Sequence, residues 1–217
     1  LAIANTKKHE FIACKNAFHG RTFGSLSATY DKKYRAKFKP LVSSFKFVEY
    51  GDATKIKRAI TSKTAAVILE PIQGEAGVIV PHSQYLKEVL GICEQKGVLL
   101  ILDEVQCGNG RTGTYFEYLS HGIKPHIVTT AKGLANGLPI GATLARGLDF
   151  TPGDHASTFG GNSLCAAVAL SVIETITKQG LMKNAVKQGN YIQEQIRKMK
   201  KKEVKQQEKV LVHNFWM

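Results

Sequence analysis

Long apolar runs, paired cysteines and linker-like segments are all missing from this sequence, and each absence narrows its possible class. No stretch of about 18 apolar residues occurs, so we expect no membrane-spanning helix. The four cysteines lie far apart and form no CxxC pair, which disfavours a metal site and a disulfide framework. Unpaired cysteines favour a reducing compartment, and we expect the cytoplasm or, alternatively, the mitochondrial matrix.

Acidic residues are scarce beside basic ones. Lys and Arg total 30 against 17 Asp and Glu, which gives a formal net charge of +13. The excess lies in residues 30–65 and 183–209, whereas the rest of the chain is close to neutral. Such segments are typical of a solvated face, and no zinc-finger, helix-turn-helix or RNP signature accompanies them. We therefore expect no nucleic-acid partner and relate the positive potential to small anionic ligands.

The length of the chain suits one large domain or slightly more. With 217 residues and 43 % hydrophobic content it can bury a substantial core. It begins at Leu1 without an initiator Met, and its opening residues are too few for a signal peptide. We therefore expect a fragment or a processed chain.

Short apolar runs alternate with helical patterns over most of the chain. The expected strands are Glu10–Cys14, Phe45–Val48, Ala65–Leu69, Val98–Leu102 and Ile127–Thr129, with Ile140–Ala145 as a further candidate. The expected helices are Asp52–Thr61 and Ser83–Lys96, the second capped by Ser83 and ended by Gly97. This order predicts an α/β fold with a mostly parallel sheet flanked by helices, whose active residues follow the carboxyl ends of strands.

The sequence changes character after residue 162. From Ser163 to about Lys202 the spacing is helical, with interruptions expected at Gly180 and Gly189. We therefore divide the chain into a large domain over residues 1–180 and a helical segment over residues 181–217, which ends in a basic tail from about residue 200.

Lys132 and Asp103 form the most informative pair of residues. Lys132 lies in a glycine-rich turn after an apolar strand, where loss of solvent would let its amine act as a nucleophile. Asp103 ends the apolar run Val98–Leu102, and a buried carboxylate can hold the proton of a pyridine nitrogen. The pair predicts a pyridoxal-phosphate site, although a surface lysine and a helix-capping aspartate are the simpler alternatives. Side-chain alternation directs Glu104 away from Asp103.

Other motifs follow the remaining strands. Val105 can lie against the ring of a flat cofactor and Gln106 can reach a polar ring substituent; Phe18 can stack and Arg21 can hold a carboxylate. We interpret His19 as a structural, hydrogen-bonded histidine. Residues 158–162 either bind phosphate or form a helix-entry loop capped by Asn162. Of Glu70 and Glu75, one suits a structural role and the other can face a substrate. Neither GxGxxG nor a Walker motif is present.

Five segments together resemble the class III pyridoxal-phosphate aminotransferases of the ornithine and acetylornithine type. They occur in family order across roughly residues 10–180 and read FHGRT (18–22), LEPIQGEAGV (69–78), LILDEVQCGNGRTG (100–113), TTAKGLANGLPIGA (129–142) and STFGGN (157–162). Cys107 and Asn109 depart from residues that are commonly threonine and apolar in the family. The upstream phosphate-binding loop and the C-terminal small domain of the family have no counterpart, and the resemblance ends at about Met199. The resemblance therefore implies that the large domain over residues 1–180 is incomplete at its N-terminus, and that residues 181–217 lead toward an absent small domain and diverge from about residue 200.

The resemblance implies the large domain of a fold-type-I pyridoxal-phosphate enzyme and a homodimer with sites at the subunit interface. It implies that Lys132 is the catalytic, cofactor-bound lysine and that Asp103 pairs with the ring nitrogen. Val105 and Phe18 would enclose the ring, and Gln106 would meet its phenolic oxygen. The remaining implied contacts are Thr158 to the phosphate of the neighbouring subunit's cofactor, Arg21 to a substrate carboxylate, and Glu75 at the substrate site.

The FHGR, AKGL and STFGGN segments favour the acetylornithine branch of the family. The resemblance therefore implies transamination between acetylornithine and 2-oxoglutarate in arginine biosynthesis, with an amino acid and a 2-oxo acid as substrates. The alternatives are a related class III enzyme acting on ornithine, 4-aminobutyrate or a lysine-pathway substrate, and a non-catalytic fragment. No metal, nucleic acid or membrane partner is implied.

Overall fold

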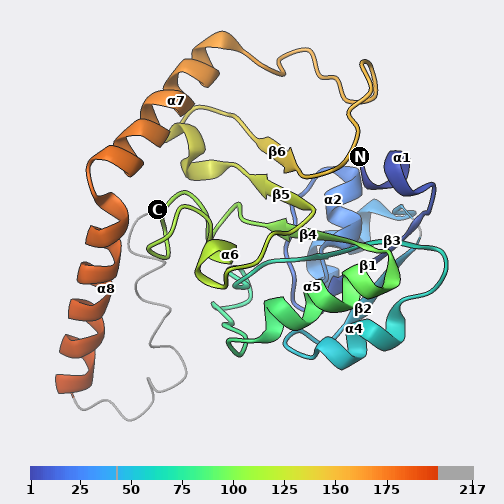
Figure 1. The fold of residues 1–217 in the computed structure, drawn as a ribbon, viewed down its shortest axis with the longest axis horizontal. Helices are drawn as coiled ribbons and strands as arrows, with labels where there is room; N and C mark the ends of the chain where they lie inside the picture. Colours follow the sequence, from blue (N-terminus) through green and yellow to red (C-terminus); the bar gives the residue numbers. More distant parts are fainter. Residues whose placement is uncertain (43, 200–217) are drawn as a thin grey trace.

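A six-stranded sheet organises the chain in this computed structural model, which describes residues 1–42 and 44–199 (Figure 1). The strand order is β2-β1-β3-β4-β5-β6. Five parallel strands, β1 to β5, are joined at one edge by the antiparallel β6. The strands are β1 (Glu10–Cys14), β2 (Phe45–Val48), β3 (Thr64–Leu69), β4 (Leu99–Asp103), β5 (Ile127–Thr130) and β6 (Ala142–Ala145). The mostly parallel α/β fold predicted from the sequence is confirmed.

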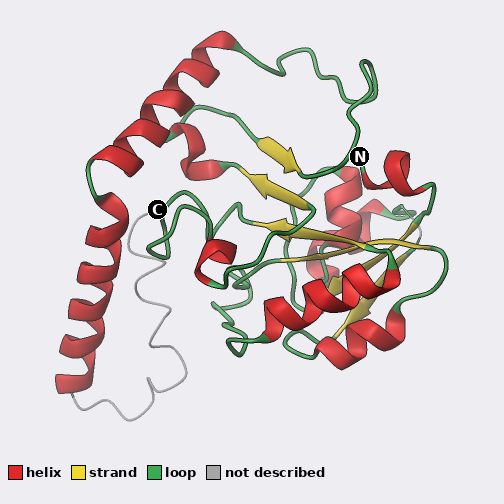
Figure 2. Cartoon of the chain, in the orientation of Figure 1, coloured by secondary structure: helices red, strands yellow, loops and turns green. Residues whose placement is uncertain are grey.

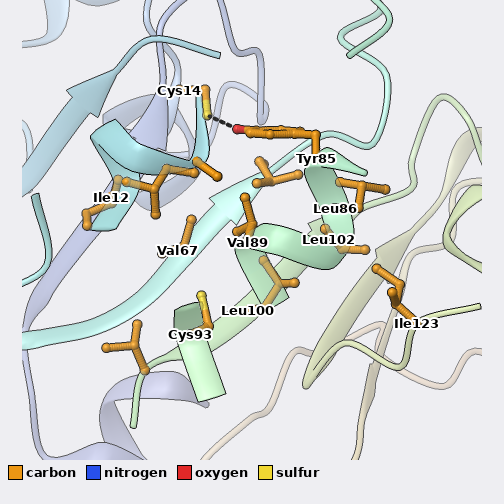
Figure 3. Close-up of a cluster of buried hydrophobic side chains, with 14 of the residues drawn as sticks. Ile12, Cys14, Val67, Tyr85, Leu86, Val89, Cys93, Leu100, Leu102 and Ile123 are labelled. Carbon is orange, nitrogen blue, oxygen red and sulfur yellow. Dashed lines mark hydrogen bonds between the residues drawn. The ribbon is translucent and has the colours of Figure 1, made fainter. Parts of the chain in front are cut away.

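The main core lies between the sheet and helices α4 (Ala53–Ala59) and α5 (Tyr85–Lys96), which pack on each other (Figure 2). Alternate residues of the strands, such as Leu100 and Leu102, point into this layer because successive side chains of a strand face opposite sides. Figure 3 shows these strand residues meeting the apolar face of α5, with the Tyr85 hydroxyl 3.7 Å from the Cys14 sulfur. Burial raises the pKa of the Cys14 thiol to about 12.

The opposite face of the sheet carries a smaller apolar cluster. Leu99 and Ile101 of β4, the neighbours in sequence of the main-core leucines, meet Leu1 and Ala2 at the start of α1 (Ala2–Thr6). The remaining short helices lie in the connections: α2 (Phe23–Ala28), α3 (Lys32–Arg35), η1 (Ala36–Phe38), α6 (Glu117–Ser120) and η2 (Lys132–Ala135). The alternation along β4 therefore decides which side of the sheet each following residue faces.

Two long helices follow the sheet, α7 (Ser163–Lys178) and α8 (Leu181–Lys198). The expected break at Gly180 is confirmed, since this residue is left-handed and the two helix axes bend by 63°. The expected break at Gly189 is wrong, because Gly189 is a buried residue within the continuous helix α8. The basic tail expected from about residue 200 lies outside the described residues.

The residues that end the two predicted helices agree with the sequence analysis in part. Asp52 caps α4 through its carboxylate, which accepts the Lys55 N–H, and Gly97 ends α5 in a left-handed conformation. Ser83 does not cap α5, because the helix begins one residue later and Gln84 occupies the cap position without a side-chain hydrogen bond.

No single helix among residues 1–42 and 44–199 has the length and apolar content needed to cross a membrane. Only α7 and α8 taken together, across the bend between them, reach the length and apolar composition of a membrane-spanning segment among the described residues.

Candidate active site

The loops that follow the carboxyl ends of the parallel strands hold most of the predicted site residues. His19 follows β1, Glu70 follows β3, Val105 follows β4, and Lys132 follows β5. Parallel strands place these loops at one edge of the sheet, which is where open α/β folds bind their ligands. The expectation that the chemistry gathers at this edge is therefore met by the topology.

Asp103 is the last residue of β4 and is buried, with 7 % of its surface exposed. Its Oδ2 lies 2.8 Å from the His19 Nδ1, and its Oδ1 accepts the Val105 backbone N–H at 3.1 Å. The His19 side chain is also buried, and its Nε2 has no partner. The interpretation of His19 as a hydrogen-bonded structural residue is confirmed, and its partner is the carboxylate that the sequence singled out.

Glu104 points to the other side of the strand, as alternation predicts. Its carboxylate is fully buried and accepts the N–H groups of Glu117 at 3.0 Å and Tyr118 at 2.9 Å, and the Cys107 thiol at 3.0 Å. Burial raises the pKa of the Glu104 carboxyl. Glu104 therefore holds the start of α6, whereas the Asp103 carboxylate contacts His19 and the loop that follows β4.

Lys132, Val105 and Gln106 line one cavity of about 540 Å³. Its walls come from the loop after β4, the turn that begins η2, the turn after β3, and α7 and α8; Asn109, Gly74, Ile176 and Met182 are among them. Lys132 is exposed in this chain, so the expected desolvation of its amine is not provided by the described residues. Its backbone is left-handed, with φ of 47°, which is costly for a residue with a side chain.

Gly74 explains how the Gln106 side chain fits at the rim of this cavity. A Cβ added at Gly74 would lie 2.2 Å from the Gln106 Oε1, so any other residue at this position would force the end of the Gln106 side chain to move. The glycine of the GE pair thus permits the present orientation of the Gln106 amide.

Glu70 connects Phe18 to this rim. The carboxylate is 3 % exposed and accepts the Phe18 N–H at 3.0 Å and the Gly74 N–H at 3.1 Å. Burial raises the pKa of the Glu70 carboxyl. Glu70 is the structural member of the Glu70 and Glu75 pair, as one of the two was expected to be. Phe18 does not itself line the cavity in this chain.

Tyr34 joins three predicted residues and was missed by the sequence analysis. Its ring packs edge-on against Phe18 with centroids 5.3 Å apart, and the Arg21 guanidinium carbon lies 5.2 Å from its centroid. The Tyr34 hydroxyl donates to the Glu75 Oε1 at 3.2 Å. Arg21 and Glu75, the two expected substrate contacts, therefore both contact Tyr34. Tyr34 belongs to a basic segment in which the sequence analysis found no motif.

Thr158 is not brought near Lys132. It lies in an exposed segment before α7 and does not line the cavity. The structure does confirm Asn162 as the cap of α7, since its Oδ1 accepts the Cys165 N–H at 3.0 Å. The helix-entry interpretation of residues 158–162 is therefore correct within a single chain.

The described residues contain no group of three or more His, Cys, Asp or Glu side chains arranged to hold a metal ion. The four cysteines are free.

Solved structures with the same fold are aminotransferases. An ornithine aminotransferase from Toxoplasma gondii, described with partial occupancy of PLP at its active site, superposes with a TM-score of 0.84 and 34 % identity over 88 % of this chain and 46 % of its own. A Bacillus anthracis aminotransferase gives a TM-score of 0.83 with 29 % identity over 91 % of this chain and 51 % of its own.

The curated relatives are also named as aminotransferases. Acetylornithine aminotransferase of Methanosarcina mazei is 48 % identical over 94 % of this chain and 52 % of its own length. The Methanopyrus kandleri protein of the same name is 48 % identical over 83 % of this chain and 47 % of its own. The chain therefore spans about half the length of the curated relatives it matches.

The family match also extends beyond the range marked by the five motifs. The model described as aminotransferase class-III matches residues 1–211, past Met199, where we expected the resemblance to end. Together with the strand topology and the convergence of Lys132, Val105 and Gln106 on one cavity, this match shows that the chain belongs to the class III aminotransferase family.

Proposed function

We propose that this chain is the lysine-bearing part of a pyridoxal-phosphate-dependent aminotransferase that transfers the amino group of acetylornithine to 2-oxoglutarate in arginine biosynthesis. One observation carries the proposal: Lys132, Val105 and Gln106 line the same cavity, and the Val105 N–H donates to the buried Asp103 carboxylate. The names of the curated relatives support the choice of acetylornithine over ornithine.

The residues present fit pyridoxal phosphate. Bound pyridoxal phosphate supplies an aldehyde for a lysine amine and a protonated ring nitrogen that can accept electrons. Asp103 is held by His19 and the Val105 N–H, so its carboxylate is oriented to keep a proton on a ring nitrogen. Gly74 leaves room for Gln106 to turn its amide toward a phenolic oxygen. Val105 lies on the cavity wall. Phe18 is connected to the wall residue Gly74 through the Glu70 carboxylate, which accepts the N–H groups of both. Val105 and Phe18 would cover the ring.

The roles of the other residues follow from their chemistry. Lys132 would hold the cofactor, and its amine would move a proton at the reacting carbon of the substrate; such a group supplies roughly 10²–10⁴-fold in rate. Arg21 would hold a substrate carboxylate, with its guanidinium oriented by Tyr34. Glu75 would face the same substrate and is oriented by the Tyr34 hydroxyl.

A homodimer is part of the proposal because α7 leaves much of its apolar surface uncovered. Leu164 is 64 % exposed, Leu170 59 %, and the nearby Phe159 82 %. Apolar patches of this kind mark protein–protein contacts. Thr158 lies in the segment that leads into this surface, which suits contact with the phosphate of a partner's cofactor better than contact within its own chain.

The test is attachment of the cofactor to a named lysine. The purified chain is incubated with pyridoxal phosphate, reduced with borohydride and digested, and the modified peptide is identified by mass spectrometry. We expect the adduct on Lys132, its loss in Lys132→Ala, and its retention in Lys87→Ala, an exposed lysine on α5 that serves as the matched control. An adduct distributed over surface lysines and unchanged in Lys132→Ala would refute the proposal.

Substrate choice and assembly need separate measurements. If the proposal holds, acetylornithine will change the absorbance of the loaded chain at lower concentration than ornithine or 4-aminobutyrate. Equilibrium sedimentation should give a dimer for the unaltered chain and a monomer for Leu170→Lys. A monomer in both cases would contradict the assigned interface.

A further inference from the structure

The turn that presents Lys132 packs against α7 and also receives hydrogen bonds from the Asn109 side chain of a neighbouring loop. Lys132 has a left-handed backbone, and Ala131 before it is also outside the regular helix and strand regions. Within the turn, the Leu134 N–H donates to the Ala131 carbonyl at 3.0 Å. A non-glycine residue in the left-handed region has a conformational cost, so this turn needs contacts that offset it.

Asn109 provides those contacts. It lies in the loop after β4, four residues beyond Val105, and lines the same cavity as Lys132. Its Nδ2 donates to the Ala131 carbonyl at 3.0 Å and to the Thr130 hydroxyl at 3.1 Å. The Ala131 carbonyl thereby accepts two donors, one from its own turn and one from the neighbouring loop.

The amide of Asn109 is itself oriented. The Tyr115 hydroxyl donates to the Asn109 Oδ1 at 3.3 Å, which directs the Nδ2 toward Ala131. The Asn109 Cβ also lies 3.6 Å from where a Cβ on Gly133 would stand, so the two loops are in close contact. A chain of contacts therefore runs from Tyr115 through Asn109 to the residue that precedes Lys132.

We propose that Asn109 is a positioning residue that holds the Lys132 turn in its left-handed conformation and couples it to the loop bearing Val105 and Gln106. The importance of this turn rests on the proposed function, which assigns the Lys132 amine to the cofactor. The hydrogen bonds themselves require no cofactor. The inference extends the site to a residue that touches neither cofactor nor substrate in the assigned roles.

A simpler explanation is that Asn109 is present because its own backbone is left-handed, with φ of 55°. Asn109→Gly separates the two explanations, because glycine accepts this conformation and removes only the side chain. Asn16→Gly is the matched control, since Asn16 is exposed and also left-handed, with φ of 64°. Tyr115→Phe is a milder second variant that leaves the Asn109 amide in place but removes its orienting hydroxyl.

The measurement is amide hydrogen exchange of the Leu134 N–H in the full chain without cofactor. Loss of two hydrogen bonds should raise its exchange rate about tenfold in Asn109→Gly, with a smaller increase in Tyr115→Phe and none in Asn16→Gly. The amides of Ile127 and Val128 in β5, which make no hydrogen bond with the Asn109 side chain in the contacts described above, should keep their rates in all three variants. An equal increase in β5 and in the turn, or an increase no larger than that of Asn16→Gly, would overturn the proposal.

A second readout separates this inference from the proposed function. If the unaltered chain attaches pyridoxal phosphate at Lys132, Asn109→Gly should need about tenfold more cofactor for the same adduct yield. If the unaltered chain does not modify Lys132, the proposed function fails, and the exchange rates of the Leu134 N–H still decide whether Asn109 holds the turn.

Discussion

Replacing Glu70 with alanine should destabilise the chain by about 2–4 kcal/mol. The Glu70 carboxylate is 3 % exposed and accepts the N–H groups of Phe18 and Gly74, which belong to different loops of the candidate site. A buried donor that loses its acceptor costs about 1–3 kcal/mol, and both N–H groups would lose theirs. Relief of the cost of burying the carboxylate offsets part of that sum. Glu70→Gln keeps one acceptor oxygen and should cost about half as much.

Urea denaturation followed by circular dichroism measures these differences. Glu88→Ala is the control, since this side chain is 48 % exposed and pairs with His82 at a distance of 3.9 Å. Its unfolding free energy should stay within about 0.5 kcal/mol of the unaltered chain. If Glu70→Ala also stays within that limit, the two hydrogen bonds do not stabilise the fold and the reasoning is wrong.

The same carboxyl gives a pH dependence with a definite sign. Burial raises the pKa of Glu70 above 4.5 in the folded chain, so the folded state binds more protons than the unfolded state between the two pKa values. The contribution of Glu70 to stability is therefore complete below pH 4.5 and declines as the pH rises through the folded value. The difference between the unaltered chain and Glu70→Gln should shrink over this interval; a difference that grows would contradict the assigned direction.

Three further outcomes are expected from the described contacts. Gly74→Ala should displace the Gln106 side chain and weaken pyridoxal-phosphate binding by about tenfold. Gly91→Ala is the control: its added Cβ would meet no atom within 4 Å, and alanine favours the helix α5, so the variant should be more stable in urea by about 0.5–1 kcal/mol. Glu104→Ala should cost about 2–4 kcal/mol and increase the exchange of the first α6 amides, since two of their N–H groups lose an acceptor. A thiol reagent should modify Cys165 rapidly in the native chain and the three buried cysteines only after unfolding.

Local patterns predicted the sheet well because its strands are nearly all apolar and sharply bounded. The strand beginning at Glu10 has the predicted limits. The strand predicted over Val98–Leu102 is shifted by one residue, so that Asp103 is its last residue and does not follow it. Helix ends were harder to predict from residue type. Ser83 is a favourable cap by composition, but the turn of the chain starts α5 one residue later. Gly189 was expected to interrupt the helix because of its residue type, but it is buried inside the continuous α8.

The candidate site was predictable where a residue follows a strand and unpredictable where contacts come from distant loops. Asp103 and Lys132 could be placed from their positions after β4 and β5. The link from Asp103 to His19 joins residues far apart in sequence, and so does the link from Tyr34 to Glu75. Tyr34 lies in a lysine-rich segment whose composition indicates only a solvated surface. No periodic or motif signal distinguishes a tyrosine that orients two site residues from one that is simply exposed.

Two neighbouring acids at the end of β4 separate the needs of folding from the needs of chemistry. Glu104 faces the protein interior and α6, and Asp103 faces His19. A saturation mutagenesis experiment that scores abundance and turnover separately should therefore divide at this peptide bond. Substitutions of Glu104 should lower both scores to a similar extent, while substitutions of Asp103 that keep its volume should lower turnover far more than abundance. The pleat of one strand thus gives two adjacent codons different tolerances to mutation.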